Sequence, residues 1–344
     1  MLFKGLIIGL CFFCSHIVAQ KSVTLQLKWT HQFQFAGYYM AKQKGFYDEV
    51  GLDVIIKPAN PMMPDTFEPV ANNKAQFGVG HSGILQQRIN GQPLVAMAAM
   101  LQFSPYCWMV KDTSDIFHPR NFANKRITGV SRKDATELMV MLKRSGVDTD
   151  RLKVYEGENP NQAWIENTLD AMQVYVTTEP YYMTQQGIAH RLICPQRYGM
   201  DVYADILFTS EYMLKKHPQT VEKFYQASLK GWRYAMMNMD EAINVTQQVY
   251  APSKSFHQLA FEAEVLKDYI MPPTTNLGHM SIAKWRLIAD LYSIQQSKFD
   301  EVKAGFIYKY QEPEAIQLSW MLIAAILVSI ISIPLYIRLI FSKK

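Results

Sequence analysis

The feature that most constrains the fold of this chain is the alternation of strand-like and helix-like segments along its first 210 residues. One alternating set occupies residues 23–112 and includes Leu94–Leu101, a continuous apolar run that predicts a buried parallel strand. A second set fills residues 126–194, after a polar stretch that contains proline. Residues 206–209 then predict a strand that returns to the first set, and helical patterns follow it.

Two alternating sets joined by two crossings predict an α/β protein with two lobes around a hinged cleft. We expect lobe 1 at about residues 23–112 and 205–315, and lobe 2 at about residues 113–204. The hinge is expected near residues 110–120 and 196–206. At 344 residues the chain is long enough for both lobes and a full hydrophobic core.

The stretch Val23–Gly51 is the most distinctive unit of the chain. It begins as an alternating strand, passes through a loop after Trp29 and turns helical at about Ala36. Because small ligands bind where strands end and helices begin in α/β folds, we expect Trp29–Tyr39 to form one wall of a pocket for a flat, polar molecule. The stretch contains seven aromatic residues from Trp29 onward: Trp29, Phe33, Phe35, Tyr38, Tyr39, Phe46 and Tyr47.

Four residues of this wall are candidate ligand contacts. Trp29 ends the strand, where its ring either stacks on a heteroaromatic ligand or packs in the core beneath the first helix. Because neighbouring side chains on a helix point in different directions, we expect at most one of Tyr38 and Tyr39 to face the ligand, and we prefer Tyr38. His31 and Gln34 either hydrogen-bond ring nitrogens of the ligand or make ordinary loop contacts.

Further candidates follow later strands. His81 and Ser82 stand at a strand-to-helix turn, which favours a polar or anionic ligand group, although Ser82 alone could be a helix cap. Ser104 and Tyr106 follow the buried apolar run and could line the cleft. Glu179 begins a helix in the second set. Its carboxylate either accepts N–H groups of an aminopyrimidine or balances the helix dipole.

The start of the chain predicts export. Residues 1–19 have the pattern of a secretory signal peptide, with Lys4 ahead of an apolar core and a small-residue ending before Gln20. An uncleaved N-terminal anchor is the alternative. Cys107 and Cys194 remain after removal of the signal, and either a disulfide or two free buried thiols fits the sequence.

The end of the chain predicts a membrane anchor. Residues 316–337 contain no charged side chain over 22 positions, and a bilayer-spanning helix needs about 20. We therefore expect a transmembrane helix at residues 316–340. Arg338 and two lysines follow the uncharged run, which places residues 341–344 in the cytoplasm and residues 20–315 in the periplasm. The expected location is the inner membrane, with a single pass.

Charge and motif content exclude several classes of function. The net charge is +5, but 4 of the 35 basic residues lie in the two terminal segments, which leaves 31 against 30 acidic residues. A nearly neutral middle offers no basic field for nucleic acid. The sequence has no HExxH, paired CxxC, calcium-loop, GxSxG or glycine-rich phosphate motif. We therefore predict no metal site and no catalytic residue.

Three runs of sequence resemble a known family. They are LKWTHQFQFAGYYMAKQKGFYDEVGLDV from Leu27, KAQFGVGHSGILQQR from Lys74 and HMSIAKWRLIADLY from His279. They resemble the thiamine-pyrimidine-precursor branch of periplasmic substrate-binding proteins, of the thiamine-pyrimidine-synthase-like and SsuA-like type, over residues 23 to about 308. The resemblance implies a type II periplasmic-binding-protein fold that closes on its ligand by hinge motion. Members with this opening motif also resemble the outer sensing domains of membrane-bound kinases and diguanylate cyclases.

The branch includes the eukaryotic-type thiamine pyrimidine synthase. That enzyme uses a lysine that carries pyridoxal phosphate, a histidine that becomes part of the product, and a cysteine-rich segment with iron. In this chain Gly80 falls where the lysine is expected and Ile84 where the histidine is expected, while His81 is offset. Cys194 stands alone instead of in a cluster. The synthase is therefore the alternative hypothesis, and no cofactor is expected.

The first hypothesis is a membrane-anchored periplasmic solute-binding protein, not an enzyme. Its expected ligand is a thiamine-precursor pyrimidine or a related small heterocycle. Because only four residues follow the predicted span, another protein must respond to closure of the lobes. That partner is an ABC permease if the role is uptake, or a separate sensor kinase or diguanylate cyclase if the role is signalling.

Overall fold

The computed structural model describes residues 20–60, 65–129 and 135–310. The predicted signal peptide, transmembrane helix and cytoplasmic tail lie outside these residues. Among the described helices, none is long and apolar enough to cross a bilayer. The main compact unit of the chain ends at Tyr308.

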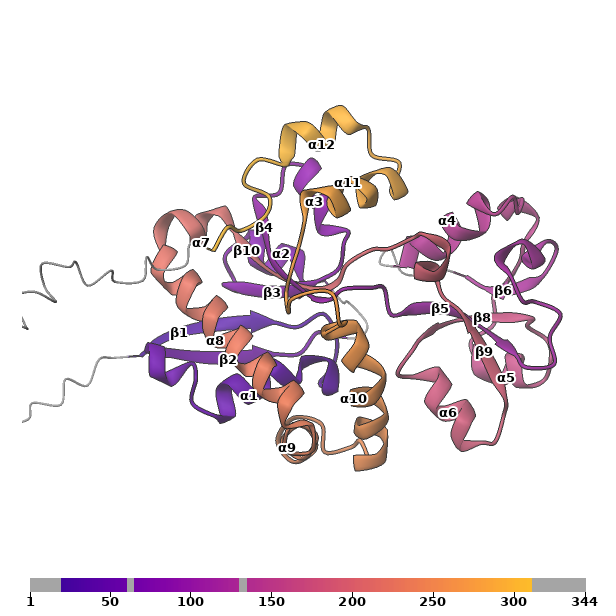
Figure 1. Cartoon of the computed structure of the whole chain (residues 1–344), viewed down its shortest axis with the longest axis horizontal. Helices are drawn as coiled ribbons and strands as arrows, with labels where there is room; N and C mark the ends of the chain where they lie inside the picture. The colour runs from indigo at the N-terminus through magenta and orange to yellow at the C-terminus, as the bar shows by residue number, and fades with distance from the viewer. Residues whose placement is uncertain (1–19, 61–64, 130–134, 311–344) are drawn as a thin grey trace, which may run out of the picture. The chain divides into compact units, whose positions relative to one another are not determined.

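The first sheet has the strand order β2-β1-β3-β10-β4, and Figure 1 shows it beside the second sheet. β1 runs parallel to β2 and β3, whereas β10 runs antiparallel to β3 and β4. The alternation seen in the sequence buries Val23 and Leu25 of β1. The strands are β1 (Lys21–Gln26), β2 (Leu52–Lys57), β3 (Phe77–Gly80), β4 (Leu94–Leu101) and β10 (Ala204–Ser210).

The pairing of β4 differs from its prediction. All eight residues of the strand are buried, as the apolar run predicts, but the strand pairs antiparallel with β10. The chain at residues 306–308 runs along its other side, where Ala96 N–H donates to Phe306 O at 2.9 Å and Tyr308 N–H donates to Ala96 O at 2.8 Å. The apolar run therefore indicates that both faces of the strand are buried. It does not indicate whether the neighbouring strand is parallel or antiparallel.

Helices cover both faces of the first sheet. Leu207 of β10 packs in a core cluster with residues of α1 and α8, whereas Ile206 and Phe208 pack in a cluster on the other face with residues of α2, α3 and α11. These helices and their neighbours in the chain are α1 (Ala36–Gln43), α2 (Phe67–Ala71), α3 (Ile84–Ile89), α7 (Glu211–Lys216), α8 (Pro218–Met237), α9 (Met239–Val245), α10 (Phe256–Ile270), α11 (Ile282–Leu291) and α12 (Gln296–Val302).

Helices α1 and α8 approach each other closely through two glycines. A Cβ atom at Gly231 of α8 would lie 2.3 Å from the carbonyl oxygen of Gly37 and 2.5 Å from Cβ of Ala41, both in α1. A Cβ atom at Gly37 would lie 2.0 Å from the ring of Trp232. The contact fixes α1, and with it the loop that precedes α1, against the C-terminal helices.

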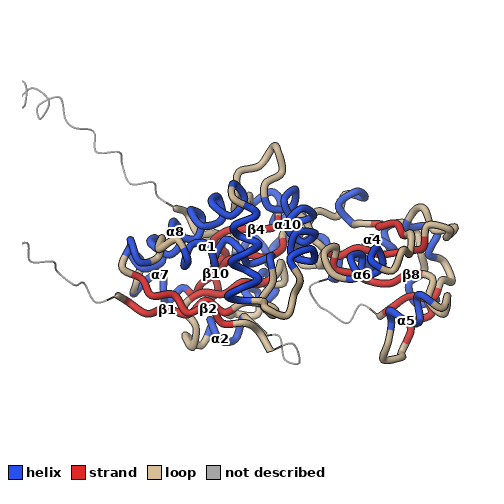
Figure 2. Tube along the Cα trace, turned by 90° about the horizontal axis from the view of Figure 1, so that it is seen from below, coloured by secondary structure: helices blue, strands red, loops and turns tan. Residues whose placement is uncertain are grey.

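The second sheet has the order β7-β6-β8-β5-β9 and forms lobe 2 (Figure 2). β6 runs parallel to β7 and β8, and β5 antiparallel to β8 and β9. The elements are β5 (Tyr106–Lys111), β6 (Arg126–Thr128), β7 (Lys153–Tyr155), β8 (Ala171–Tyr175), β9 (His190–Ile193), α4 (Thr136–Arg144), α5 (Pro160–Ile165) and α6 (Glu179–Gln185).

The chain crosses between the sheets at residues 102–105 and again at residues 199–203. The first crossing therefore lies before Tyr106, whereas the sequence placed the lobe boundary near residue 112 and the first hinge at residues 110–120. The reason is that β5, which follows β4 closely in the chain, belongs to the second sheet. Cys107 of β5 forms a disulfide with Cys194, with Cα atoms 4.4 Å apart. Of the two alternatives for these cysteines, the disulfide is therefore the correct one.

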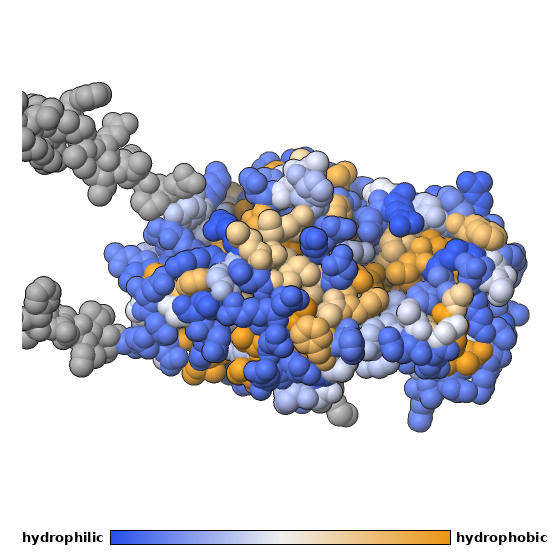
Figure 3. Space-filling view, turned by 60° about the horizontal axis from the view of Figure 1, so that its bottom comes forward, coloured by the Kyte–Doolittle hydropathy of each residue, from blue (hydrophilic) through white to orange (hydrophobic). Residues whose placement is uncertain are grey.

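Aromatic side chains are concentrated in the cores. Trp108, Trp164, Trp232 and Trp285 are all fully buried. The face in Figure 3 is mostly hydrophilic, with apolar residues gathered near its middle. Most of the aromatic content therefore serves packing, and only a few rings are left for a ligand.

Candidate functional site

A cavity of about 590 Å³ lies where strands of both sheets end. Lys28 and Trp29 follow β1, His81 follows β3, and Tyr175 ends β8. The carboxyl ends of parallel strands are where ligand sites of α/β folds form. The lining residues are Lys28, Trp29, Gln32, Gln34, Asp65, Thr66, Phe67, His81, Gln87, Tyr106, Thr128, Gly129, Pro160, Gln173, Val174, Tyr175, Thr178 and Glu179.

Five of the nine predicted ligand contacts line this cavity: Trp29, Gln34, His81, Tyr106 and Glu179. Trp29 is half-buried, and it packs against the core cluster of β1, α1 and α8 as well as lining the cavity. Its carbonyl oxygen accepts the N–H of Ala59 at 3.1 Å, which holds the loop against the chain that follows β2. The two roles considered for Trp29, pocket wall and core packing, therefore occur together.

Tyr38 and Ser82 lie in the protein interior instead. Tyr38 is fully buried, and its ring meets Trp232 edge-on at 5.5 Å, so burial raises the pKa of its hydroxyl well above the ordinary value. Ser82 is 1% exposed and hydrogen-bonds the hydroxyl of Tyr292, the residue after α11. The helix α1 presents both of its tyrosines, Tyr38 and Tyr39, to the core rather than to the cavity.

His31 and Ser104 also make contacts within the protein. The Nδ1 atom of His31 lies 2.9 Å from the hydroxyl of Tyr39, and burial lowers the pKa of this histidine. Ser104 Oγ donates to the buried carboxylate of Glu137 and accepts the N–H of Tyr106 at 3.2 Å. Ser104 thus fixes the start of β5 and supports Tyr106, but it is not itself among the residues that line the cavity.

A buried ion pair stands at one side of the cavity. The Nζ atom of Lys28 lies 2.6 Å from Oδ1 of Asp205, and these side chains are 9% and 1% exposed. Oδ2 of the same carboxylate accepts the Nε2–H of Gln34 at 3.0 Å. A buried carboxylate is costly unless it is paired and hydrogen-bonded. In Asp205 one carboxylate oxygen pairs with Lys28 and the other accepts from Gln34.

The polar network continues beneath the loop that follows β1. Gln32 hydrogen-bonds Gln34 through the two side-chain amides, and Lys254 Nζ donates to Gln32 Oε1 at 3.1 Å. Lys254 also pairs with Glu262 of α10, whose other oxygen accepts the N–H of Phe33 at 3.0 Å. Burial raises the pKa of Glu262. The glutamines of this loop are therefore held in place before any ligand arrives.

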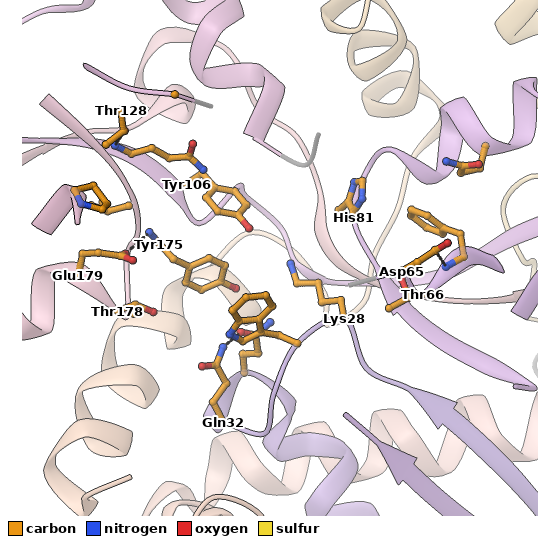
Figure 4. A pocket seen from close by; sticks show the side chains of 18 residues that line it. Lys28, Gln32, Asp65, Thr66, His81, Tyr106, Thr128, Tyr175, Thr178 and Glu179 are labelled. Atoms are coloured by element: carbon orange, nitrogen blue, oxygen red, sulfur yellow. Dashed lines mark hydrogen bonds between the residues drawn. The ribbon is translucent and has the colours of Figure 1, made fainter. Parts of the chain in front are cut away.

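Lys28, Gln32 and Gln34 form the polar wall of lobe 1. Aromatic rings from the second sheet face this wall (Figure 4). Tyr106 and Tyr175 are paired residues on β5 and β8, and their rings meet at 90° with centroids 5.3 Å apart. The Nζ atom of Lys28 lies 5.7 Å from the centre of the Tyr175 ring. An aromatic surface on lobe 2 therefore opposes Trp29 and the ammonium group of lobe 1.

His81 and Glu179 both have a local structural contact in addition to lining the cavity. His81 Nδ1 accepts the N–H of Gly83 at 3.1 Å, so the neutral ring carries its proton on Nε2 and can donate from there. Its ring also meets Phe67 at 5.1 Å. Glu179 Oε2 accepts the N–H of Tyr175 at 2.9 Å, which stabilises the turn from β8 to α6.

Two positions that the synthase resemblance assigns to functional residues carry other residues in this chain. Gly80 takes the place expected for the lysine, and a Cβ atom there would lie 2.7 Å from Phe67 and 3.1 Å from Phe208. Ile84, in the place expected for the histidine, is fully buried. Within the described ranges, no group of three or more His, Cys, Asp or Glu side chains is placed to hold a metal ion.

Sequence reasoning missed several lining residues, among them Lys28, Thr128, Gln173 and Tyr175. Lys28 and Thr128 stand at or just after the ends of β1 and β6, so the rule that found Trp29 and His81 could also have found them. Tyr175 ends β8, so the same rule could have found it as well. Its pairing with Tyr106 of β5, which is not local in sequence, brings the two rings together.

The fold is that of periplasmic binding proteins. The structure of the periplasmic aliphatic sulphonate binding protein SsuA from Escherichia coli matches with a TM-score of 0.63. The match covers 87% of this chain and 96% of that protein at 13% sequence identity, so it shows the fold alone.

The chain belongs to the NMT1/THI5-like family, whose model matches residues 32–242. Riboflavin-binding protein RibY from Chloroflexus aurantiacus is 23% identical over 256 residues, which cover 72% of each chain. The formylaminopyrimidine-binding protein of Halalkalibacterium halodurans is 23% identical over 277 residues, which cover 78% of this chain and 83% of that protein. The predicted family resemblance is thus confirmed.

Proposed function

We propose that this chain is an exported solute-binding protein for a small, flat heterocycle that contains a pyrimidine ring. The observation that carries the proposal is the composition of the cavity wall, with Trp29 on one lobe and Tyr106 and Tyr175 on the other. Aromatic faces bind planar rings. The amides of Gln34 and Gln173 offer the donors and acceptors that match the polar edge of a pyrimidine.

The names of two relatives support this ligand class. One relative is named for binding riboflavin and the other for binding formylaminopyrimidine. The tricyclic ring system of riboflavin includes a fused pyrimidine-type ring, so both names point to a planar heterocycle that contains such a ring. The cavity volume of about 590 Å³ lies within the range of roughly 300–1,000 Å³ usual for small-molecule sites.

The mechanism we propose is clamping. A ligand that touches residues of both lobes binds the closed arrangement more tightly than the open one, and it shifts the equilibrium by that difference in affinity. Trp29 and Gln34 would supply the contacts of lobe 1, and Tyr106, Tyr175 and Gln173 those of lobe 2.

Binding without catalysis is the role we favour. At Gly80, where the resemblance places the lysine of thiamine pyrimidine synthase, a Cβ atom would lie 2.7 Å from the ring of Phe67, so a side chain there would require that ring to move. If the synthase alternative were correct, addition of pyridoxal phosphate to the purified chain would produce the absorbance of a protein Schiff base. We expect free cofactor absorbance only.

The proposed location is the inner membrane, with the binding domain in the periplasm. The support is the uncharged run at residues 316–337 and the basic residues after it. An ABC permease, or a separate sensor kinase or diguanylate cyclase, would respond to closure of the two lobes. Alkaline extraction tests the anchor: the full chain should stay with membranes, and a variant that ends at residue 310 should be released.

A thermal-shift panel tests the ligand class. The purified full chain in detergent would be heated with riboflavin, formylaminopyrimidine, 4-amino-5-hydroxymethyl-2-methylpyrimidine and an alkanesulfonate. We expect at least one pyrimidine-containing compound to raise Tm, with the increase growing as ligand concentration exceeds Kd. A shift with the sulfonate alone would overturn the ligand class but not the solute-binding role.

A further inference from the structure

Asp205 occupies an unusual position in β10, two residues after the second crossing between the lobes. It is the second residue of β10, it is 1% exposed, and its φ of +46° lies in the left-handed region. Its neighbours Ala204 and Ile206 pair with Leu101 and Ala99 of β4. Few residues other than glycine adopt this conformation, and such residues are concentrated where the structure has a functional reason to hold them.

The carboxylate of Asp205 holds two side chains that line the cavity. Oδ1 lies 2.6 Å from Nζ of Lys28, and Oδ2 accepts the Nε2–H of Gln34 at 3.0 Å. Lys28 in turn lies 5.7 Å from the ring centre of Tyr175, on the opposite lobe. One buried carboxylate therefore connects the crossing, the polar wall of lobe 1 and, through Lys28, the aromatic surface of lobe 2.

A second lysine–aspartate pair contacts both crossings, but it is partly exposed, with Lys284 and Asp201 side chains 16% and 38% exposed. Lys284 of α11 donates to the carbonyl oxygen of Gln102 in the first crossing at 2.6 Å, and to Oδ1 of Asp201 in the second at 2.7 Å. Burial lowers the pKa of Lys284. Lys284 and Asp201 are not among the described residues that line the cavity. The two lysine–aspartate pairs are thus alike in chemistry, but only the pair of Lys28 and Asp205 reaches the ligand site.

We propose that Asp205 is the positioning residue through which occupancy of the cavity acts on the crossing between the lobes. This rests on the proposed solute-binding function and adds a ligand requirement: a carbonyl oxygen or ring nitrogen that accepts a hydrogen bond from Lys28 or Gln34. When such an acceptor engages these donors, the partners of the Asp205 carboxylate change. Because Asp205 stands in a strained conformation beside the crossing, that change alters the relative stability of the open and closed arrangements.

The test uses Asp205→Asn in the full chain, with Asp201→Asn as the matched control. Asparagine keeps the shape of aspartate and tolerates left-handed backbone, so the variant should fold. Spin labels at Met237 and Phe117, which are 82% and 69% exposed on lobes 1 and 2, report the distance between lobes by double electron–electron resonance. The probes are riboflavin and 4-amino-5-hydroxymethyl-2-methylpyrimidine.

Without any probe, Asp205→Asn and Lys28→Met should each change the distance distribution, and the double variant should change it no further because the two residues act as one unit. Asp201→Asn combined with Lys28→Met should give additive changes. Unchanged distributions in Asp205→Asn and Lys28→Met, or additive changes in their double variant, would overturn the inference.

With a probe that the wild type binds, Asp205→Asn should bind at least about tenfold more weakly, since it leaves Lys28 without its counter-charge. The variant should also lose the shortening of the distance that the probe causes, while Asp201→Asn keeps it. If the probe shortens the distance in Asp205→Asn as much as in the wild type, the inference is wrong, although the solute-binding function still stands. If the wild type responds to neither probe, the proposed ligands are wrong. The probe-free distance distributions would then still test the role of Asp205.

Discussion

At the scale of single residues, Trp29 connects the core of lobe 1 to the cavity. Its indole is half-buried against the cluster of β1, α1 and α8, so packing limits its rotamers before a ligand binds. A ring held in this way loses little conformational entropy when a planar ligand stacks on it. This preorganisation is why we expect Trp29 to contribute more to affinity than the other residues of the opening stretch.

The variant Trp29→Ala should weaken ligand binding by about 1–3 kcal/mol, or about 5- to 150-fold in Kd, because stacking of a heterocycle on an aromatic ring is lost. Isothermal titration with whichever pyrimidine compound stabilises the wild type measures the change. Phe117→Ala is the control, since Phe117 is an exposed aromatic that does not line the cavity. Equal affinities for wild type and Trp29→Ala would show that Trp29 serves packing only.

Residues whose function depends on local chain geometry could be predicted from the sequence, and those that depend on distant pairing could not. Trp29, His81 and Glu179 were found because each stands where a strand gives way to a loop or helix. Tyr38 was misplaced because helical periodicity shows that one face of α1 is buried but not which partner covers it. That partner, Trp232, is nearly 200 residues away in the chain.

At the scale of elements, the contact between α1 and α8 decides how the opening loop is held. Gly231→Ala should destabilise the protein by about 1–3 kcal/mol, because the new methyl group would meet the backbone of α1 at Gly37. Elsewhere in a helix, replacing glycine by alanine raises the free energy of unfolding by about 1 kcal/mol. A decrease in Gly231→Ala would therefore indicate the close contact with α1. Urea unfolding measures it, with the exposed neighbour Arg233→Ala as a control that should change stability little.

The Arg126–Asp170 pair connects β6 to the start of β8. Arg126 donates to the two carboxylate oxygens from Nη2 at 2.7 Å and from Nε at 3.0 Å, and these bonds hold the pKa of Asp170 below its ordinary value of 3.8. A carboxyl whose pKa is lowered by folding stabilises the folded state above pH 3.8 and loses that contribution as pH falls through the folded pKa.

Asp170→Asn should therefore be less stable than wild type at pH 6, and the difference should shrink below pH 3.8. Urea unfolding between pH 2.5 and 6.5 measures it. The exposed Asp115, which pairs with Lys125, provides the control, because Asp115→Asn should change stability little at any pH. A difference that stayed constant down to pH 2.5 would mean that the loss in Asp170→Asn does not come from the charge of this carboxyl.

The order of elements was largely predictable from the sequence, but strand pairing was not. Period-two and continuous apolar patterns located β1, β3 and β4, because those patterns follow from burial. The antiparallel return of β10 beside β4 and the assignment of β5 to the second sheet depend on contacts between distant segments. The first hinge was misplaced for the same reason.

At the scale of the whole molecule, the two sheets share one cavity, and one hydrophobic cluster contains residues of both sheets, among them Ile206 of β10 and Trp108 of β5. The crossings at residues 102–105 and 199–203 are short, with the buried pair of Lys28 and Asp205 beside them and the partly exposed pair of Lys284 and Asp201 contacting both. Two short crossings are the kind of connection about which lobes close by changes at a few residues. Under the proposed function, such motion would give a membrane partner a signal that depends on ligand.

The most direct measurement is calorimetric titration of the purified full chain with riboflavin, formylaminopyrimidine and 4-amino-5-hydroxymethyl-2-methylpyrimidine. We expect one of them to bind with one molecule per chain, and its affinity to fall in Trp29→Ala. Absence of binding by all three at millimolar concentration, from a chain that unfolds cooperatively, would contradict the assignment of the cavity to a pyrimidine-containing ligand.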